Sequence, residues 1–379
     1  MTTLPRGVRF SLIAILLAVV AASGIHIGAE LRASAQNGAK KPSAANYDFA
    51  PVTEFVEQTY KKAELPGAAL LVYKDGQVIY KKFFGSYNET TQVPIASASK
   101  WLSAAVIMSL VDEGKLDLDA PVSKYLPNFT GKKGAITVRQ MFSHTSGLSD
   151  FPGQWNYTIT IAEYADRMAS EGELKVDPGT EVRYGSAGMQ VGGRVAEVVS
   201  GKGWNQLFRE RIADKCEMPD TTFARVEQNR NPMLAGGAAS TLTDYAHFLE
   251  MLINNGVYKG RRVLSEKSVR EMQKDQTGKL PLVVASNDRM GRKSHYGLGE
   301  WIDEQDAKGA TLQVSSPGAF GFRPWINLPR HLFGVWMVQS GRRLGQQATG
   351  SLARDSWELL DLVHRTVDKA APAQKAKKK

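Results

Sequence analysis

The chain has a single cysteine, Cys216, among its 379 residues. One thiol excludes an internal disulfide framework and any zinc site built from several cysteines. Histidines are also few, and those in the body of the chain show no metal-ligand spacing such as H-E-x-x-H. A lone cysteine is compatible with an oxidising compartment, and we interpret Cys216 as a structural residue rather than as a nucleophile.

The body of the chain also has little excess charge. The formal net charge is +10, but residues 369–379 hold five lysines and no acid, and residues 1–35 carry +2, which leaves +3 for the rest. A nucleic-acid-binding protein would be expected to concentrate positive charge on its folded surface. We therefore expect no nucleic-acid partner and interpret residues 369–379 as a disordered basic tail, with contact to anionic lipid or surface polymers as the alternative.

One extended apolar run, Leu12–Ala22, lies near the N-terminus and follows Arg6 and Arg9. The small residues Ala33–Ala35 offer an A-x-A cleavage site. Basic residues, an apolar run and a small-residue site in this order predict a secretory signal peptide over residues 1–35.

A membrane anchor is the alternative interpretation of the same segment. Leu12–Ala29 is long enough to approach a bilayer span, so the segment could remain uncleaved in the inner membrane. Residues 36–46, rich in Gly, Lys, Pro and Ser, predict a linker. In either case we expect the folded body, residues 47–368, to be periplasmic or extracellular.

Strand-like runs lie at both ends of this body. Two early runs, Gly67–Tyr73 and Gln77–Gly85, are joined by a hairpin turn signal. Three late runs are Thr311–Ser315, Ala319–Asn327 and Leu332–Gln339. Strands at the two ends of a chain often meet in one antiparallel sheet. We therefore predict an α+β fold with a sheet of about five strands.

Helical periodicity predicts the rest of the architecture. Asp48–Ala63 and Leu352–Val367 should cover the sheet as terminal helices. The sheet would come from about 47–90 and 295–368, and a largely helical region from about 91–294. Within that region we predict helices over Lys100–Glu113, Ile161–Ser170, Ala187–Ser200, Trp204–Asp214, Thr243–Asn254 and Ser265–Gln273.

The tetrad Ser97-Ala98-Ser99-Lys100 is an S-x-x-K motif at the start of a helix that is apolar on every side. Ser97 and Lys100 are three residues apart, so they share one helix face. A neutral amine can accept the proton of a serine hydroxyl, which is otherwise a poor nucleophile. The Ser97 N–H could face a developing oxyanion. The alternative is that Ser97 caps the helix and Lys100 is solvated.

Two further motifs carry polar groups at breaks between elements. Tyr184-Gly185-Ser186 precedes a helix, and its tyrosine could move a proton; alternatively Ser186 is an ordinary helix cap and Tyr184 an ordinary buried aromatic. Ser316-Pro317-Gly318-Ala319 lies between two strands. Gly318 would let a ligand approach the backbone, and the Ala319 N–H could be a second oxyanion donor; a plain Pro-Gly turn is the alternative.

The three motifs in this order resemble the serine β-lactamase and penicillin-binding protein superfamily, in its class C β-lactamase, esterase and D,D-peptidase branch. The resemblance covers about Tyr47–Thr366. Supporting stretches are Pro94–Lys100, Asp112–Val122, Leu126–Pro127, Thr137–Leu148, Tyr184–Ser186, Ala235–Thr241 and Tyr296–Gly299.

The resemblance implies a β-lactamase/transpeptidase-like fold and an acyl-enzyme mechanism without metal or cofactor. It implies that Ser97 is the nucleophile, Lys100 its base and Tyr184 the proton-transfer partner. The N–H groups of Ser97 and Ala319 would form the oxyanion hole. Ser186, Ser316 and Gly318 would contact substrate.

Two departures from the family pattern concern substrate recognition. Ser186 stands where β-lactamases and transpeptidases usually carry Asn, and Ser316 where they usually carry Lys or His. A charged hydrogen bond is worth about 1.5–3 kcal/mol against about 0.5–1.5 for a neutral one. Recognition of a substrate carboxylate should therefore be weak unless Arg323 or another base supplies the charge.

The departures favour an exported esterase or amidase acting on a small-molecule ester, amide or peptide-like substrate. A D,D-carboxypeptidase or class C-type β-lactamase is the alternative with the same chemistry. A non-catalytic binding or sensor module with a penicillin-recognising fold is the alternative of another class.

Overall fold

The computed structural model describes residues 47–151, 155–224, 229–283, 294–340 and 346–370, and Tyr47–Lys369 forms one compact unit. The predicted signal peptide and linker lie outside these ranges, as does the tail beyond Ala370. Lys369 and Ala370, which we assigned to the basic tail, instead end the last helix, α11 (Gln346–Ala370). In the described ranges no helix combines the length and the apolar composition needed to cross a bilayer.

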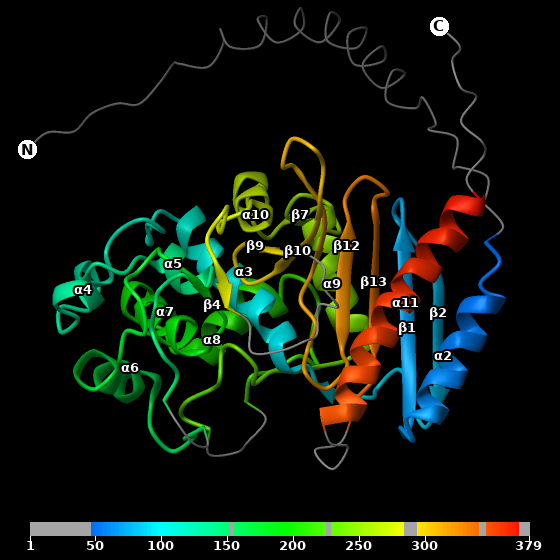
Figure 1. Cartoon of the computed structure of the whole chain (residues 1–379), viewed down its shortest axis with the longest axis horizontal. Helices are drawn as coiled ribbons and strands as arrows, with labels where there is room; N and C mark the ends of the chain where they lie inside the picture. Colours follow the sequence, from blue (N-terminus) through cyan, green and yellow to red (C-terminus); the bar gives the residue numbers. More distant parts are fainter. Residues whose placement is uncertain (1–46, 152–154, 225–228, 284–293, 341–345, 371–379) are drawn as a thin grey trace, which may run out of the picture. The chain divides into compact units, whose positions relative to one another are not determined.

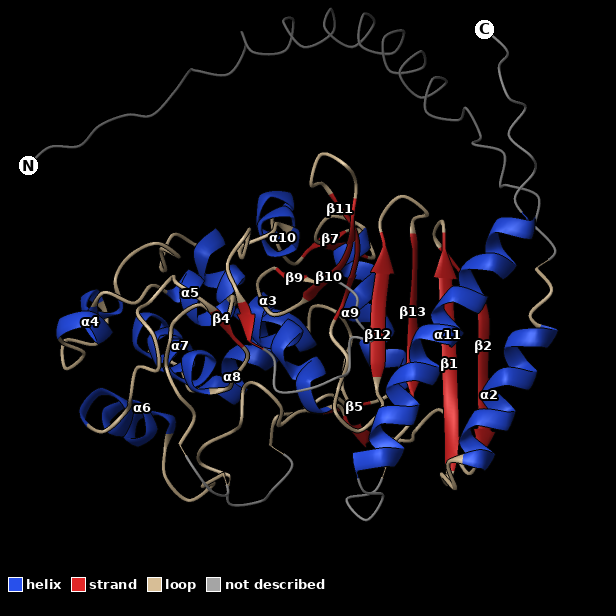
Figure 2. Ribbon diagram, viewed as in Figure 1, coloured by secondary structure: helices blue, strands red, loops and turns tan. Residues whose placement is uncertain are grey.

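An antiparallel sheet forms the centre of the unit (Figure 2). Its seven described strands run in the order β2-β1-β13-β12-β11-β10-β9, and each neighbouring pair is antiparallel. The strands are β1 (Gly67–Lys74), β2 (Gln77–Gly85), β9 (His295–Tyr296), β10 (Trp301–Gln305), β11 (Thr311–Ser315), β12 (Arg323–Asn327) and β13 (Leu332–Met337). Both ends of the chain therefore meet in one sheet, as predicted.

The five predicted runs are all in this sheet, but the predicted number of strands was too small. The prediction missed β9, which is only two residues long, and β10, whose Asp303 and Glu304 give it a low strand propensity. It also began β12 four residues early. Residues 319–322 form a turn instead, in which Gly321 has a φ of 101°.

Alternate residues of β1 pack into two separate layers. Leu70 and Val72 belong to a cluster with α11 and with α2 (Ala50–Lys62), which lie side by side over one face of the sheet (Figure 1). Leu71 and Tyr73 face the other way, into a larger core shared with α9 (Leu242–Ile253). A strand buried on both faces explains the nearly continuous apolar sequence of β1.

The helical region is attached to the second layer. Its helices are α3 (Ser99–Asp112), α4 (Gly131–Gly134), α5 (Val138–Phe142), α6 (Ile161–Ser170), α7 (Ala187–Ser200), α8 (Trp204–Phe208) and α10 (Glu266–Gln273). The predicted helix over Trp204–Asp214 is helical from Trp204 to Ala213, but its second half, Arg209–Ala213, is a π-helical turn that follows α8 directly. Cys216 lies fully buried just after that turn, and burial raises the pKa of its thiol to about 12, which fits the structural role we assigned.

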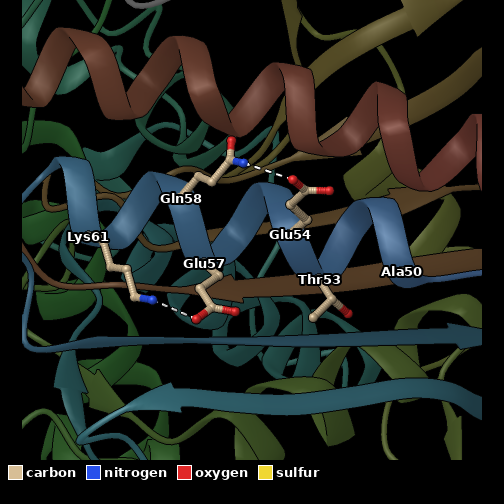
Figure 3. Close-up of a pocket in the computed structure, with 6 residues that line it drawn as sticks. All are labelled: Ala50, Thr53, Glu54, Glu57, Gln58 and Lys61. Atoms are coloured by element: carbon tan, nitrogen blue, oxygen red, sulfur yellow. Dashed lines mark hydrogen bonds and ion pairs between the residues drawn. The ribbon is translucent and has the colours of Figure 1, made fainter.

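A shallow hollow lies along the outer side of α2 (Figure 3). Its polar side chains pair along the helix: Gln58 donates to Glu54 at 3.0 Å, and Lys61 donates to Glu57 at 2.6 Å. The hollow is lined by this one helix, on the sheet face that α11 also covers. It brings together none of the predicted site residues.

Candidate active site

Ser97 lies in a tight 3₁₀ turn, Ala96–Ala98, that follows the short strand β3 (Val93–Pro94). We predicted that Ser97 opens the helix; it lies in the turn just before α3. Ala96 has a φ of 45°, in the left-handed region that residues other than Gly rarely adopt. Such a conformation costs about 1–3 kcal/mol and persists only where the surroundings enforce it.

Buried hydrogen bonds hold the Ser97 turn on both sides. The Ser99 hydroxyl donates to the Ala96 carbonyl at 2.7 Å and accepts from the Ala238 N–H at 3.0 Å. The Tyr245 hydroxyl donates to the Ala98 carbonyl at 2.8 Å. The strained turn is therefore fixed by two elements distant in sequence.

Lys100 lies beside the Ser97 hydroxyl. Its Nζ is 3.1 Å from Ser97 Oγ and donates to the main-chain carbonyl of Ala235 at 2.7 Å. The side chain is only 3% exposed, so the alternative in which Lys100 is solvated is wrong. Sequence reasoning did not identify the Ala235 carbonyl as a partner, because it lies 135 residues away in the chain. The Lys100 amine and the Ser97 hydroxyl therefore lie within proton-transfer distance, and the lysine is buried.

Tyr184 belongs to a group of four packed rings, which we call the aromatic cluster: His144, Tyr184, Tyr296 and Trp301. The Tyr184 ring stacks on Trp301 with centroids 5.2 Å apart and contacts His144 at 4.4 Å. Lys100 Nζ lies 4.5 Å from the centroid of the Tyr184 ring. The structure thus brings Tyr184 to Lys100 as predicted. Within the described residues its hydroxyl makes no hydrogen bond to Ser97 or Lys100.

His144 is buried beneath Tyr184. Burial, with a contribution from the charge of Lys100, holds the pKa of His144 well below its usual range, so the imidazole is neutral. Its Nδ1 accepts a long hydrogen bond, 3.4 Å, from the Gly185 N–H, while its Nε2 has no hydrogen-bond partner among the described residues. We predicted a structural role for this histidine, and its contacts place it against Tyr184, the residue predicted to transfer a proton.

The end of β11 packs against the Ser97 turn. A Cβ on Gly318 would lie 2.1 Å from the Ile95 carbonyl oxygen, so only glycine fits there. The next residue, Ala319, is exposed. This close approach puts the two predicted oxyanion donors, Ser97 and Ala319, on adjacent segments. An N–H at the start of a helical turn has no partner within that turn and can point at a ligand.

Ser316 is placed differently from our prediction of a substrate contact. It is 2% exposed, and its hydroxyl lies 3.3 Å from the main-chain carbonyls of both Ser97 and Gly299. A hydroxyl has one proton to donate, and both acceptors belong to the protein. Ser316 therefore ties β11 to the Ser97 turn.

Arg323 does not replace the missing cation. Its guanidinium lies 3.6 Å from the Trp357 ring of α11 and donates to Ser356 Oγ at 3.2 Å. It also forms an ion pair with buried Asp303 at 3.6 Å. These contacts hold the charge on the α11 side of the sheet, so the expectation that Arg323 could serve the substrate is wrong.

Ser186 stands at the N-terminus of α7, but its hydroxyl makes no capping hydrogen bond. The carboxylate of Asp150, from the preceding loop, accepts the Ser186 and Ala187 N–H groups instead, at 2.8 and 2.6 Å. The alternative in which Ser186 is an ordinary N-cap is therefore wrong for its side chain. Sequence reasoning missed Asp150, because no local pattern links it to a helix 36 residues away.

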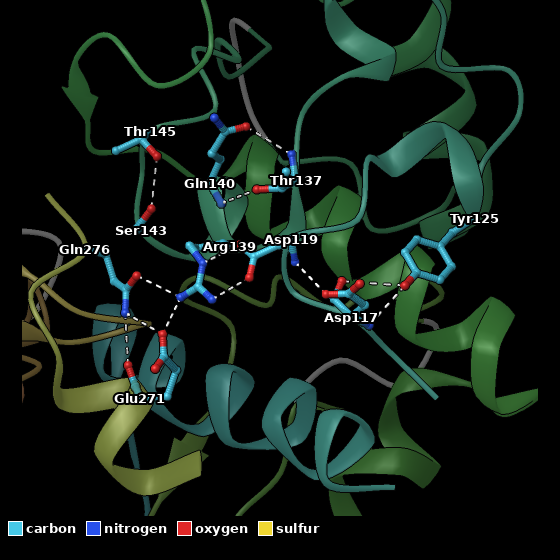
Figure 4. A network of polar contacts seen from close by, with 10 residues as sticks. All are labelled: Asp117, Asp119, Tyr125, Thr137, Arg139, Gln140, Ser143, Thr145, Glu271 and Gln276. Atoms are coloured by element: carbon cyan, nitrogen blue, oxygen red, sulfur yellow. Dashed lines mark hydrogen bonds and ion pairs between the residues drawn. The ribbon is translucent and has the colours of Figure 1, made fainter. Parts of the chain in front are cut away.

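A polar network supports the segment that carries His144 (Figure 4). Arg139 of α5 donates to both carboxylate oxygens of Asp119, at 2.6 and 2.8 Å, and to Gln276 at 2.9 Å. It also pairs with Glu271 of α10. The guanidinium lowers the pKa of Asp119, which keeps the pair charged. The network joins three segments and fixes the exit of α5 towards His144.

Two exposed apolar side chains lie on a strand that pairs with the two residues just before Tyr184. The short strand β4 (Val182–Arg183) ends just before it and pairs in parallel with β8 (Leu282–Val283). Leu282 and Val283 are among the few large hydrophobic residues that the described chain exposes, at 38% and 44%. A hollow of about 430 Å³ between β4 and β9 is lined by Val182, Leu282 and Tyr296, with Lys279 and His295 as its basic groups.

Comparison with known proteins agrees with this geometry. A sequence model of the family described as Beta-lactamase matches residues 52–354. The chain is similar to a candidate beta-lactamase from Bacteroides dorei DSM 17855, with 34% sequence identity and a TM-score of 0.75 over 83% of this chain and 100% of that one. A family VIII carboxylesterase shares the fold alone, with 18% identity and a TM-score of 0.66 over 82% of this chain and 97% of the other.

Among curated proteins, Protein flp of Staphylococcus aureus (strain MW2) is 28% identical over 187 residues. The match spans 45% of this chain but only 38% of the relative. The family model covers most of the chain, and the Bacteroides dorei protein is similar over its full length. The chain therefore belongs to the beta-lactamase family of serine hydrolases and has its β-lactamase/transpeptidase-like fold.

Proposed function

We propose that the protein is an exported esterase or amidase that works through an acyl-enzyme on Ser97. The observation that carries the proposal is the 3.1 Å contact between Lys100 Nζ and Ser97 Oγ. In its neutral form the amine takes the hydroxyl proton as Oγ attacks the substrate carbonyl carbon. The carbonyl oxygen becomes an oxyanion that the N–H groups of Ser97 and Ala319 stabilise.

Collapse of this intermediate breaks the bond to the leaving group, which receives a proton through Lys100 and Tyr184. A water molecule then attacks the acyl carbon and passes one proton to the same groups. The bond between the acyl carbon and Ser97 Oγ breaks, Oγ takes that proton back, and the acid is released. Lys100 Nζ lies 4.5 Å from the centroid of the Tyr184 ring, which supports Tyr184 as the proton partner. The Tyr184 hydroxyl would have to turn towards Ser97 when substrate binds, and catalytic hydrogen bonds often tighten only in the substrate complex.

The surroundings of the site favour a neutral, partly apolar substrate. The Ser316 hydroxyl donates its hydrogen bond to a protein carbonyl, and Arg323 is held on the α11 side of the sheet. Leu282 and Val283 offer apolar surface beside Tyr184. A substrate whose leaving group lacks a carboxylate needs no cation at this position.

A D,D-carboxypeptidase or β-lactamase is the second candidate. Membership of the beta-lactamase family and likeness to the Bacteroides dorei protein favour it. The placement of Ser316 disfavours it. The non-catalytic binding module remains a third candidate, and the buried Ser97–Lys100 contact weighs against it, since a pure binding site has no need of a buried amine at a hydroxyl.

Export rests on the predicted signal peptide or anchor in residues 1–35. Fractionation of cells that produce the full chain tests it. Release of a body that starts at Gln36 supports a cleaved signal, full-length chain in the membrane fraction supports the anchor, and full-length chain in the cytosol contradicts export.

The test of function uses the body from Gln36, with Ser97→Ala as control. Each protein is given p-nitrophenyl butyrate and, separately, a fluorescent penicillin, and its intact mass is measured. Ester turnover that requires Ser97, without a penicillin adduct, supports the esterase. A Ser97-dependent penicillin adduct supports the second candidate. If neither probe gives a Ser97-dependent signal, and a reactive fluorophosphonate gives none either, that result would contradict the acyl-enzyme.

A further inference from the structure

One neighbouring segment, residues 144–150, binds most of the main-chain N–H groups around Tyr184. The Arg183 N–H donates to the His144 carbonyl at 2.8 Å, and the Gly185 N–H donates to His144 Nδ1. The Ser186 N–H donates to both carboxylate oxygens of Asp150, at 2.8 and 3.1 Å. Every main-chain N–H from Arg183 to Ser186 except that of Tyr184 itself is thus bound by this segment.

Asp150 contributes a second hydrogen bond at the start of α7. Its Oδ1 accepts the Ala187 N–H at 2.6 Å in addition to the Ser186 N–H. The first N–H groups of a helix have no partner inside it, and a carboxylate there also complements the positive end of the helix dipole. Asp150 therefore caps a helix of 14 residues from a separate loop.

The Ser186 side chain takes no part in this cap. Serine is among the preferred N-cap residues, because its oxygen accepts the N–H of the second or third helical residue. In this structure the Ser186 hydroxyl makes no such bond, and Asp150 binds a different pair of N–H groups, those of Ser186 and Ala187. The Ser186 residue remains half-exposed next to Tyr184 in the chain.

We propose that Asp150 is a positioning residue for the active site: by binding the N–H groups of Ser186 and Ala187, it fixes the start of α7 and the backbone that carries Tyr184. The proposal rests on the proposed function for its kinetic consequences only. Its structural consequence, the loss of stability when the carboxylate is removed, is independent of any activity.

Removal of the Asp150 carboxylate makes a prediction about stability. Ser186→Ala alone should leave the thermal midpoint nearly unchanged, because the hydroxyl caps nothing. Asp150→Ala should lower the midpoint, because the N–H groups of Ser186 and Ala187 lose their acceptor. Asp150→Ala with Ser186→Ala should lower it by no more than the sum of the two single changes, since the Ser186 oxygen reaches neither N–H group that Asp150 binds.

The kinetic prediction concerns kcat for p-nitrophenyl butyrate. Asp150→Ala should lower kcat about 10- to 100-fold with a smaller change in KM, because a shift of about 1 Å in a catalytic group has effects of this size. Asp150→Asn keeps one oxygen acceptor for the N–H groups and should restore most of the lost activity. A residue that only stabilised the fold would change the thermal midpoint without this split between kcat and KM.

Glu163 provides a matched control. Its carboxylate accepts the Thr160 N–H at 2.5 Å in the capping box of α6, a helix that carries no predicted site residue. Glu163→Ala should cost stability as Asp150→Ala does and should leave kcat unchanged. Equal kcat values for the Asp150→Ala and Glu163→Ala proteins, at a temperature where both are folded, would overturn the positioning role.

The stability arm separates this proposal from the proposed function. If the wild-type protein shows no Ser97-dependent hydrolysis, the hydrolase proposal fails, while the role of Asp150 at the start of α7 can still be read from thermal unfolding. If Asp150→Ala leaves the thermal midpoint unchanged, the carboxylate does not hold the start of α7 and the proposal on Asp150 is wrong. Hydrolysis by Ser97 would be unaffected by that result.

Discussion

The two halves of the candidate site differ in how they relate to the family pattern. The half that would perform acylation keeps the residue types of the family pattern: Ser97 and Lys100 are in contact, and the amine lies over the Tyr184 ring. The half that would recognise a charged substrate is altered, because Ser316 bonds to protein carbonyls and Arg323 is held by Asp303. The comparison suggests that chemistry and recognition can be varied separately on one scaffold, since they depend on different elements.

The largest expected effect comes from breaking the acylation half. Lys100→Met removes the amine and keeps a side chain of similar length and apolar character in a buried place. We expect kcat for p-nitrophenyl butyrate to fall about 10²- to 10⁴-fold, the usual contribution of a general base. Thermal unfolding checks that the protein remains folded. A folded variant with kcat within tenfold of wild type would show that Lys100 is not the general base.

The next largest effect is expected at Gly318, where the segment after β11 meets the Ser97 turn. A Cβ at position 318 would meet the Ile95 carbonyl at 2.1 Å, so Gly318→Ala must push the β11 turn away from Ser97. Loss of one oxyanion donor costs about 10²- to 10³-fold in kcat, and we expect a loss in that range. Gly203→Ala is the control, because nothing lies within 4 Å of its added Cβ. Equal kcat in the two variants would argue against an oxyanion donor at Ala319.

A smaller effect is expected from the aromatic cluster. Trp301 stacks on Tyr184 with an angle of 19° between the rings. Because a ring pair is worth about 0.5–1.5 kcal/mol, Trp301→Leu should lower kcat by about threefold to tenfold, and Trp301→Phe should retain most of the activity. Steady-state kinetics of the two variants, with KM reported separately, measures this. An unchanged kcat in Trp301→Leu would show that Tyr184 is held by its backbone alone.

The smallest effect is a pH dependence of stability that comes from His144. Its pKa in the folded protein is lowered by burial, so below its ordinary value of 6.5 the unfolded chain binds a proton that the folded chain does not. The stabilising contribution of neutral His144 is therefore fully present above pH 6.5 and is lost progressively as the pH falls below that value.

Urea unfolding of wild type and His144→Asn at several pH values measures this contribution. Asparagine tolerates the left-handed backbone of this position, where φ is 60°. The difference in unfolding free energy between the two proteins should shrink as the pH falls from 7.5 to 5. A difference that stays constant over this range would mean that His144 titrates alike in both states.

Features set by neighbours in sequence could be predicted from the residues. Helix α6 begins and ends where predicted, because Thr160 and Glu163 form a capping box. Helix α7 ends at Ser200 because Gly201 adopts a left-handed conformation, with a φ of 68°. The S-x-x-K spacing likewise fixed the pairing of two residues one helical turn apart.

Features set by distant contacts could not be predicted. The strained Ala96 is held by Tyr245 and Ala238, and Lys100 by the Ala235 carbonyl, all from a segment more than 130 residues later. The family pattern suggested substrate contact for Ser316, but the burial of its hydroxyl depends on how β11 packs against the Ser97 turn. Only the fold could show that packing.

The central claim is that acylation is retained while recognition of a carboxylate is lost. The most direct measurement compares kcat/KM for two butyrate esters, one with phenol and one with 3-hydroxybenzoate as leaving group, with Ser97→Ala as control. The account predicts Ser97-dependent hydrolysis with the neutral ester as the equal or better substrate. Preference for the carboxylate ester by about tenfold or more, the benefit of one charged hydrogen bond, would contradict it.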